Sequence, residues 1–157
     1  MITVITRSNG IKFVMLLLIL LWVSACSSVR ANSVTLDLSS QGDQLAFSQT
    51  ILQAKVGETL TIAFKNSSKA LQHNWVLVKG GDDVARQVSE AALTAGTNQQ
   101  QLLTNNATVL AHTELLPSGE SATLTFTAPT TAGQYAYLCT FPGHYLMGMK
   151  GTLHVEE

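Results

Sequence analysis

Cysteine is scarce in this sequence. The 157 residues contain two, Cys26 and Cys139. Cys26 directly follows an N-terminal apolar segment, so the domain that comes after it keeps Cys139 alone. A disulfide needs two cysteines, which excludes an internal disulfide from that domain. A lone thiol in an oxidising compartment is a liability unless something occupies it, so Cys139 requires an explanation.

The sequence also lacks an apolar run of the length that spans a membrane. A transmembrane helix needs about 20 apolar residues, whereas the run over residues 13–23 has eleven. Arg7 and Lys12 precede this run, two small residues follow it, and residues 1–25 contain no acidic residue. A positive start, a short apolar centre and a small-residue end are typical of a secretory signal. We therefore expect residues 1–25 to be a signal peptide and the protein to be exported.

Cys26 follows the small residues directly, and VSAC (23–26) resembles the bacterial lipoprotein box, in which the signal is cut before a cysteine that is then lipidated. An ordinary signal peptide with an incidental cysteine is the alternative. Each buried lipid methylene contributes about 0.8 kcal/mol, so several acyl chains would hold the protein on a membrane. We expect residues 26–33 to be the lipidated cysteine and a polar tether, placing the domain (34–157) in the periplasm or on the outer face of the cell membrane.

Positive charge is low in the part that remains. Loss of residues 1–25 removes two of the nine basic residues and none of the ten acidic ones, so the formal charge moves from −1 to −3. No basic patch survives, which argues against nucleic acid as a partner. Electrostatic steering of any partner should be weak.

Most of the domain has the pattern of short strands. β-branched and aromatic residues occur in short, often alternating runs separated by Gly, Pro, Ser and Asn. This pattern predicts strands over residues 34–38, 59–64, 73–78, 122–128, 134–139 and 151–157.

Residues 82–96 differ, because they open with acidic residues, have apolar residues near helical spacing and end at a glycine. We predict a helix there and a polar connection over 97–110. Many short strands with one helical excursion favour an all-β, two-sheet antiparallel sandwich. AGQYAYLC (132–139) also resembles a tyrosine corner, in which a tyrosine hydroxyl bonds to nearby backbone.

The chemistry is concentrated near the end of the chain, in CTFPGHYLMGMKG (139–151). Cys139, His144 and Met149 are spaced at five-residue intervals with glycine and proline between them, so one loop can bring them together. His73 opens a strand that could neighbour the strand ending at Cys139. Two imidazoles, one thiolate and one thioether match the trigonal His₂Cys site with a weak axial Met of blue-copper electron-transfer centres.

Two segments carry a resemblance to a known family. The stretch from Cys139 to Val155 resembles the copper-loop signature of the cupredoxins, and HNWVLV (73–78) resembles their upstream histidine segment. The Cys-x₄-His-x₄-Met spacing is that of auracyanins, the azurin-like blue copper proteins of filamentous green phototrophs. The resemblance covers the whole domain and implies a Greek-key sandwich binding one copper ion, with these ligands: His73, Cys139, His144 and Met149.

The resemblance also assigns residues beside the ligands. It implies that Asn74 bonds across to the Cys139–Thr140 region and so fixes ligand orientation. Azurins proper place the axial methionine four residues after the histidine, where this chain has Gly148, so we choose Met149 over Met147.

Two further departures from azurins follow from single residues. Their glycine before the upstream histidine, a distant fifth ligand, is replaced by Gln72, so we expect at most four coordinating groups. The azurin disulfide is absent, since the domain has one cysteine.

Four loop residues are candidates for a docking rim around His144. Exposed apolar patches commonly mark docking surfaces, although these residues could instead simply cap the sandwich. The rim residues are Pro142, Tyr145, Leu146 and Met147. His112 and His154 lack ligand-type neighbours, so we expect them to be structural or surface residues. Trp75, Phe126 and Tyr137 are expected in the core.

The inventory favours an electron carrier and not an enzyme. Four ligands leave no open metal position for a substrate. A copper oxidase or nitrite reductase would need His-x-His pairs, which the sequence lacks, and a copper chaperone would favour a Met-rich or multi-cysteine site. The resemblance implies a membrane quinol-oxidising complex as electron donor and a reaction-centre or other cytochrome as acceptor. We expect a monomer tethered through its N-terminal lipid.

Overall fold

The computed structural model describes residues 33–157, so the expected signal peptide and the lipidated Cys26 lie outside the described residues. The described part begins β1 (Ser33–Ser39), β2 (Ile51–Lys55), β3 (Thr59–Lys65), β4 (Val76–Val78). It continues with α1 (Asp82–Ala95), η1 (Gly96–Asn98), α2 (Gln99–Asn105), β5 (Val109–His112), β6 (Ser121–Thr127), β7 (Gly133–Leu138) and β8 (Lys150–Glu156). None of its helices is long and apolar enough to cross a membrane.

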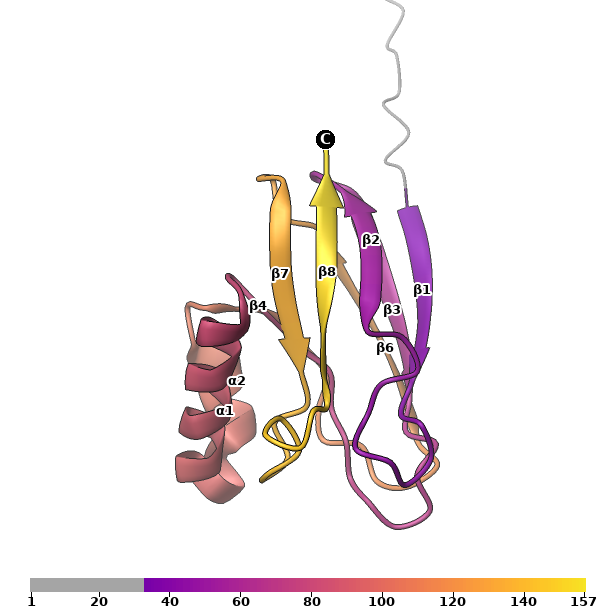
Figure 1. Ribbon diagram of the computed structural model, residues 1–157, viewed down its shortest axis with the longest axis vertical. Coiled ribbons are helices and arrows are strands. Elements are labelled where there is room, and N and C mark those ends of the chain that lie inside the picture. The colour runs from indigo at the N-terminus through magenta and orange to yellow at the C-terminus, as the bar shows by residue number, and fades with distance from the viewer. Residues whose placement is uncertain (1–32) are drawn as a thin grey trace, which may run out of the picture.

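The strands form the predicted two-sheet sandwich. One sheet has the order β1-β3-β6 and the other β2-β8-β7-β4-β5. The strand pairs are antiparallel except that β1 runs parallel to β3 and β2 runs parallel to β8. The two helices α1 and α2 lie together on one side of the five-stranded sheet (Figure 1).

The helix predicted over residues 82–96 is confirmed as α1, but the polar connection predicted over 97–110 is wrong. That segment contains η1, α2 and the start of β5. Leu103 of α2 is buried in a cluster with Val88 of α1 and Leu138 of β7. Burial of this leucine stabilises a helix of seven residues, which is too short to be stable by itself.

The main core lies between the sheets. Alternate side chains of β3, namely Leu60, Ile62 and Phe64, are fully buried there. The core residues expected from the sequence are in place: Trp75 and Tyr137 are fully buried, and Phe126 packs against them partly buried. Alternation with period two is what one buried sheet face requires.

The predicted tyrosine corner is present at the start of β7. The Tyr135 hydroxyl donates to the carbonyl oxygen of Thr131 at 2.8 Å. A second tyrosine of the same strand, Tyr137, donates to the Gln49 carbonyl oxygen at 2.6 Å. These bonds hold β7, the strand that directly precedes Cys139, to its surroundings.

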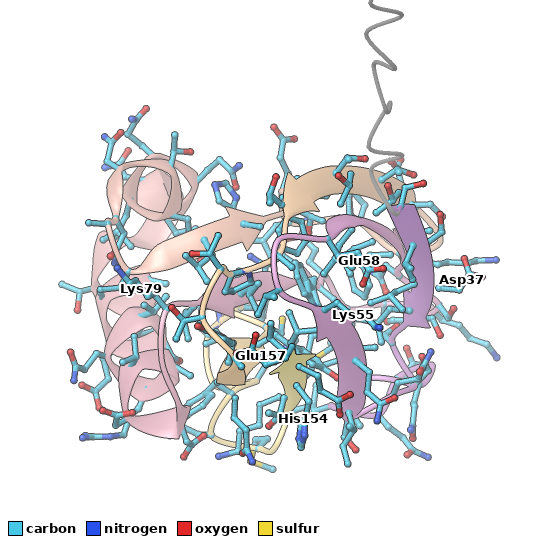
Figure 2. All side chains as sticks on the ribbon, turned by 90° about the horizontal axis from the view of Figure 1, so that it is seen from above. Asp37, Lys55, Glu58, Lys79, His154 and Glu157 are labelled. Carbon is cyan, nitrogen blue, oxygen red and sulfur yellow. The ribbon has the colours of Figure 1, made fainter. Side chains whose placement is uncertain are left out.

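The loop that carries the predicted ligands and the C-terminus lie at opposite ends of the sandwich. Figure 1 shows that β1 begins at the end where β8 and the chain terminate, whereas the loop between β7 and β8 lies at the opposite end. We call the latter the loop end. Figure 2 looks onto the other end, where Lys55, Glu58 and Glu157 are labelled.

Candidate metal centre

The pairing of β4 with β7 brings the two predicted ligand segments together. These strands run antiparallel with Val76 opposite Leu138. His73 lies three residues before Val76, and Cys139 directly follows Leu138, so both extend from the sheet at the loop end. A backbone bridge between His73 and Leu116 fixes the upstream segment from its other side.

Three predicted ligands converge on one point. The Cys139 Sγ atom lies 3.8 Å from His73 Nδ1 and 3.5 Å from His144 Nδ1. The three ligand atoms all lie within 4.8 Å of one another. His73 and Cys139 are fully buried and His144 is 5% exposed, so the cluster is shielded from water.

These separations fit a single metal ion. At the bond lengths known for zinc, about 2.0–2.1 Å to nitrogen and 2.3 Å to sulfur, two ligands at about 110–120° lie roughly 3.6–3.8 Å apart. The sulfur–nitrogen distance of 3.8 Å lies within this range, and that of 3.5 Å lies just below it. A thiol has one hydrogen and cannot serve both imidazoles at once, whereas one cation between the three atoms satisfies all of them.

The loop after β7 folds back on itself to place His144 and Met149. The Met149 N–H donates to the His144 carbonyl oxygen at 3.0 Å, and the Cys139 N–H donates to the Met149 carbonyl oxygen at 3.1 Å. Gly143 and Gly148 have φ angles of 83° and 102°, a region that favours glycine. Met149 is fully buried in the main core cluster with Cys139, while Met147 is 71% exposed.

Asn74 connects the two ligand segments. Its side-chain NH₂ donates to the Thr140 hydroxyl at 2.8 Å, and its side-chain oxygen accepts from the Thr140 N–H at 2.8 Å. Asn74 is fully buried and Thr140 is 1% exposed, so water cannot replace these bonds. The pair restrains the positions of His73 and Cys139 relative to one another.

Burial sets the protonation of the cluster. It raises the pKa of the Cys139 thiol to about 11, although the backbone N–H groups of Asn74 and Phe141 oppose the shift. Burial, reinforced by the neighbouring His73, lowers the pKa of His144 to about 4. Burial also lowers the pKa of His73, against the opposing charge of Asp43. At neutral pH the imidazoles are therefore uncharged, the form that binds metals, and a bound cation displaces the thiol proton.

The other two histidines stand apart from this cluster. His112, on β5, is half-buried, and its ring nitrogens lie 3.5 Å from Gln100 Nε2 and 3.3 Å from Thr104 Oγ1. His154 lies on β8 toward the end away from the loop, as Figure 2 shows. Neither belongs to the cluster of possible metal ligands found among residues 33–157.

One residue expected on the docking rim does not line it. Leu146 and Met147 are 74% and 71% exposed, and Pro142 is exposed as well. Tyr145 is only 4% exposed, because it packs with the buried residues of α1 and its hydroxyl donates to the Asp82 carbonyl oxygen at 3.1 Å. Its expected place on the rim is therefore corrected to the core beneath α1.

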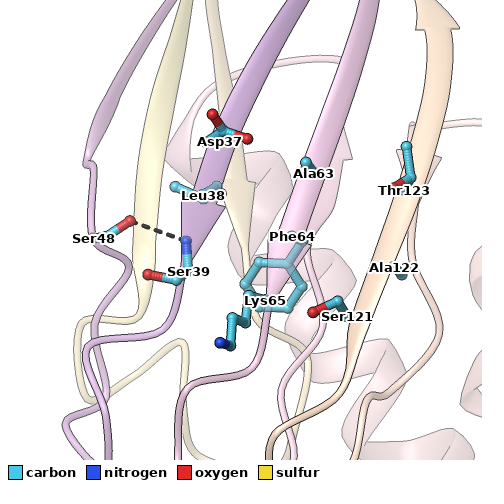
Figure 3. Close-up of a pocket in the computed structure, with 10 residues that line it drawn as sticks. All are labelled: Asp37, Leu38, Ser39, Ser48, Ala63, Phe64, Lys65, Ser121, Ala122 and Thr123. Atoms are coloured by element: carbon cyan, nitrogen blue, oxygen red, sulfur yellow. Dashed lines mark hydrogen bonds between the residues drawn. The ribbon is translucent and has the colours of Figure 1, made fainter.

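Hollows in the surface lie outside the cluster. A groove of about 530 Å³ runs beside it, between Phe141 and Pro142 on one side and the segment from η1 into α2 on the other. A second hollow, of about 370 Å³, lies on the three-stranded sheet between Asp37, Lys65 and Ser121 (Figure 3). None of the four predicted ligands lines either one.

Several residues that matter at the site were not singled out from the sequence. The Phe141 ring packs against the His144 ring, with centroids 4.5 Å apart and the ring planes tilted by 35°. Lys150 pairs with Asp82 at 2.7 Å and lies over the Tyr145 ring, tying the loop to the start of α1. The sequence could have identified Phe141, because it lies between the two ligands Cys139 and His144. The sequence could not have identified the pairing of Lys150 with Asp82, because the two residues are 68 positions apart.

A buried cysteine between two imidazoles, at one end of a β-sandwich, is the arrangement of a mononuclear type 1 copper protein. Comparison with known proteins agrees. The sequence profile of the copper binding proteins, plastocyanin/azurin family, matches residues 34–156, and the chain belongs to this family. Its cofactor is copper, and its members are electron carriers and not enzymes.

Individual relatives show how far the likeness extends. Auracyanin-A of Chloroflexus aurantiacus is 44% identical over 126 residues, which are 80% of this chain and 76% of that protein. Azurin of Bordetella pertussis is 35% identical over 82% of this chain and 88% of its own length. The reduced auracyanin structure from Roseiflexus castenholzii covers 80% of this chain and 99% of its own, with 41% identity and a TM-score of 0.73. Auracyanin A, a blue copper protein, superposes with a TM-score of 0.74.

Proposed function

We propose that this protein is a membrane-tethered type 1 copper carrier whose ligands are His73, Cys139 and His144, with Met149 as a weak axial fourth. The observation that carries the proposal is the placement of both histidine Nδ1 atoms within 3.8 Å of one buried sulfur. Bound copper would supply one-electron redox chemistry. The chain's own residues hold the ion in a fixed, dry site, which limits rearrangement when an electron arrives or leaves.

The axial assignment rests on burial. Met149 is fully buried in the cluster that contains Cys139, whereas Met147 is 71% exposed. The axial ligand tunes the potential of such sites, and loss of a donor disfavours Cu(II), so Met149→Leu should raise the reduction potential. A tenfold change in relative affinity for the two oxidation states corresponds to about 59 mV for one electron. Met147→Leu is the matched control and should leave the potential unchanged. Equal shifts in both variants would reject Met149 as a ligand.

We further propose that electrons pass through the His144 edge. Pro142, Leu146 and Met147 form the exposed apolar surface next to it, and we call these three residues the rim. A charged residue there should weaken docking of a partner whose surface is also apolar. Leu146→Lys should therefore slow electron transfer to the natural partners. Leu110→Lys is the control, because Leu110 is exposed beside Pro129 and Thr131 at the other end. Unchanged rates for Leu146→Lys would contradict the role of the rim.

The direction of β1 supports a tether that leaves the rim free. β1 begins at Ser33, at the end opposite the loop (Figure 1). Seven residue steps separate Ser33 from Cys26, which limits the reach of this segment to roughly 25 Å. A protein held through Cys26 would turn its metal end away from the membrane. Mass spectrometry of the native N-terminus tests this: an acylated Cys26 as first residue supports the tether, and an unmodified terminus contradicts it.

The proposal extends to the electron donor and acceptor. We propose a membrane quinol-oxidising complex as donor and a reaction-centre or other cytochrome as acceptor, in a protein exported to the periplasm or the outer cell surface. The similarity to auracyanin-A supports this, since that relative comes from the photosynthetic bacterium Chloroflexus aurantiacus. Quinol-dependent reduction by membranes of the source organism is the test. Reduction that is insensitive to removal of quinol would contradict the donor.

A further inference from the structure

Asn66 follows the last residue of β3 and is fully buried. Its side-chain NH₂ lies 2.8, 2.9 and 3.0 Å from three carbonyl oxygens, those of Leu71, Leu116 and Pro117. Its side-chain oxygen accepts from the Ser68 N–H at 3.0 Å and from the Ser40 hydroxyl at 3.3 Å. One buried amide thus connects three separate segments of the chain at the loop end.

Two of these contacts bear on His73. Leu71 lies two residues before it in the chain, so the bond to the Leu71 carbonyl restrains the approach to the ligand. Leu116 is its bridge partner: the His73 N–H donates to the Leu116 oxygen at 3.2 Å, and the Leu116 N–H donates back at 2.8 Å. Asn66 therefore bonds to the same carbonyl oxygen that receives the His73 N–H.

Side chains here replace the missing strand partners. Residues 66–72 belong to no strand, yet buried backbone groups must be paired. The Ser68 hydroxyl accepts from the N–H groups of Ala70 and Leu71 at 3.1 and 2.7 Å. Asp43 accepts from Ser68 and Lys69. Asn66 reaches across to the Leu116 segment, and the Ser118 hydroxyl of that segment donates back to the Ser68 carbonyl oxygen.

The chemistry of this position calls for an amide. Three carbonyl oxygens on one side require N–H donors, and two donors on the other require an acceptor. A carboxylate of the same shape would place negative charge against three carbonyls. A hydroxyl is too short to reach all five partners.

We propose that Asn66 is a positioning residue for the upstream copper ligand: it fixes the Leu116 carbonyl that receives the His73 N–H, and the Leu71 carbonyl two residues before His73. This inference rests on the proposed function for the identity of the ligand. The restraint itself exists without metal, so it can be measured on the metal-free protein and separated from copper binding.

The first measurement needs no variant. In the metal-free protein, hydrogen exchange of the Asn66 side-chain NH₂ and of the His73 backbone N–H is followed by NMR. We expect similar protection, because opening of the Asn66 amide releases the His73 bridge. If the His73 N–H exchanges at least about tenfold more slowly than the Asn66 NH₂ after correction for intrinsic rates, the bridge outlives the amide contacts and the proposal is overturned.

The second measurement compares Asn66→Ala with Ser40→Ala. Ser40 is 2% exposed, and its hydroxyl bonds to Asn66 and to the Ser67 N–H, so its loss removes two bonds of the same network without touching the His73 side. We expect Asn66→Ala to accelerate His73 N–H exchange about 10- to 100-fold, and Ser40→Ala less than about threefold. In the copper-loaded proteins, the copper hyperfine splitting should change in Asn66→Ala alone. Equal behaviour of the two variants in either readout would overturn the proposal while leaving the proposed function intact.

Discussion

The Asn74–Thr140 pair offers a demanding test of how the site is held. Asn74→Ala removes one donor and one acceptor while changing no ligand. The substitution leaves the N–H and the hydroxyl of Thr140 without their partners, 2.8 Å bonds in both cases. Because Thr140 is 1% exposed, solvent cannot readily take over either bond.

The cost follows from the two groups that remain. A buried polar group left unpaired costs about 1–3 kcal/mol, so the pair together costs about 2–6 kcal/mol of unfolding free energy. A domain typically has about 5–15 kcal/mol in total. Asn74→Asp should also destabilise the metal-free protein, because Asn74 is fully buried and a carboxylate there loses its hydration, although it still accepts from the Thr140 N–H. Its negative charge beside the copper thiolate should, however, lower the reduction potential.

Urea unfolding of the metal-free variants measures the first effect, and a double-mutant cycle with Thr140→Ala isolates the hydroxyl bond. We expect a coupling of about 0.5–1.5 kcal/mol for that bond. A loss below about 0.5 kcal/mol for Asn74→Ala would refute the reasoning, because it would mean that Thr140 finds other partners. A potential that is unchanged in Asn74→Asp would refute the electrostatic part.

Three further outcomes follow from the protonation and packing of the site. Loading with Cu(II) at pH 8 should release about one proton per ion, measured by pH-stat, since Cys139 is a thiol with a pKa of about 11 and the imidazoles are already neutral; release of none or of two contradicts this. The free energy of unfolding of the metal-free protein should decrease as pH falls below about 6.5. The histidines of the unfolded chain bind protons there, whereas burial lowers the pKa of His73 in the folded protein and lowers that of His144 to about 4. An unfolding free energy that does not change between these pH values in denaturant titrations would be contrary evidence. Gly151→Ala should cost about 1–3 kcal/mol, because a Cβ there meets the Tyr137 hydroxyl, the Cζ atom of the same ring and the Thr50 carbonyl oxygen; a loss below about 0.5 kcal/mol in thermal unfolding would argue against the clash.

The sequence was informative where local pattern and function coincide. The strand ending at Cys139 has a regular apolar pattern, and the loop after it carries ligand types at spacings that few other roles require. The prediction that His73, Cys139 and His144 lie together needed only that two neighbouring strands end at the same edge. In the structure the ligand atoms of these three residues lie within 4.8 Å of one another.

Other features depend on contacts between distant segments. Residues 99–105 are polar enough to suggest a connection, and they form α2 because Leu103 finds a buried place against Val88 and Leu138. The parallel pairs depend on which strands meet, which alternation alone does not reveal. Tyr145 follows His144 in the chain, yet its side chain points beneath α1. Nothing local distinguishes Asn66 from a turn residue, because its five partners come from three segments.

The identity of the metal-bound sulfur is the point on which the account rests. Copper-loaded protein should show an intense visible thiolate-to-copper charge-transfer band that bleaches on mild reduction and returns on oxidation. Cys139→Ser should abolish this band, since Cys139 is the free cysteine of residues 33–157 and lies between both histidines. A colourless copper complex of the unaltered protein, or a band and redox cycle that survive in Cys139→Ser, would contradict the account.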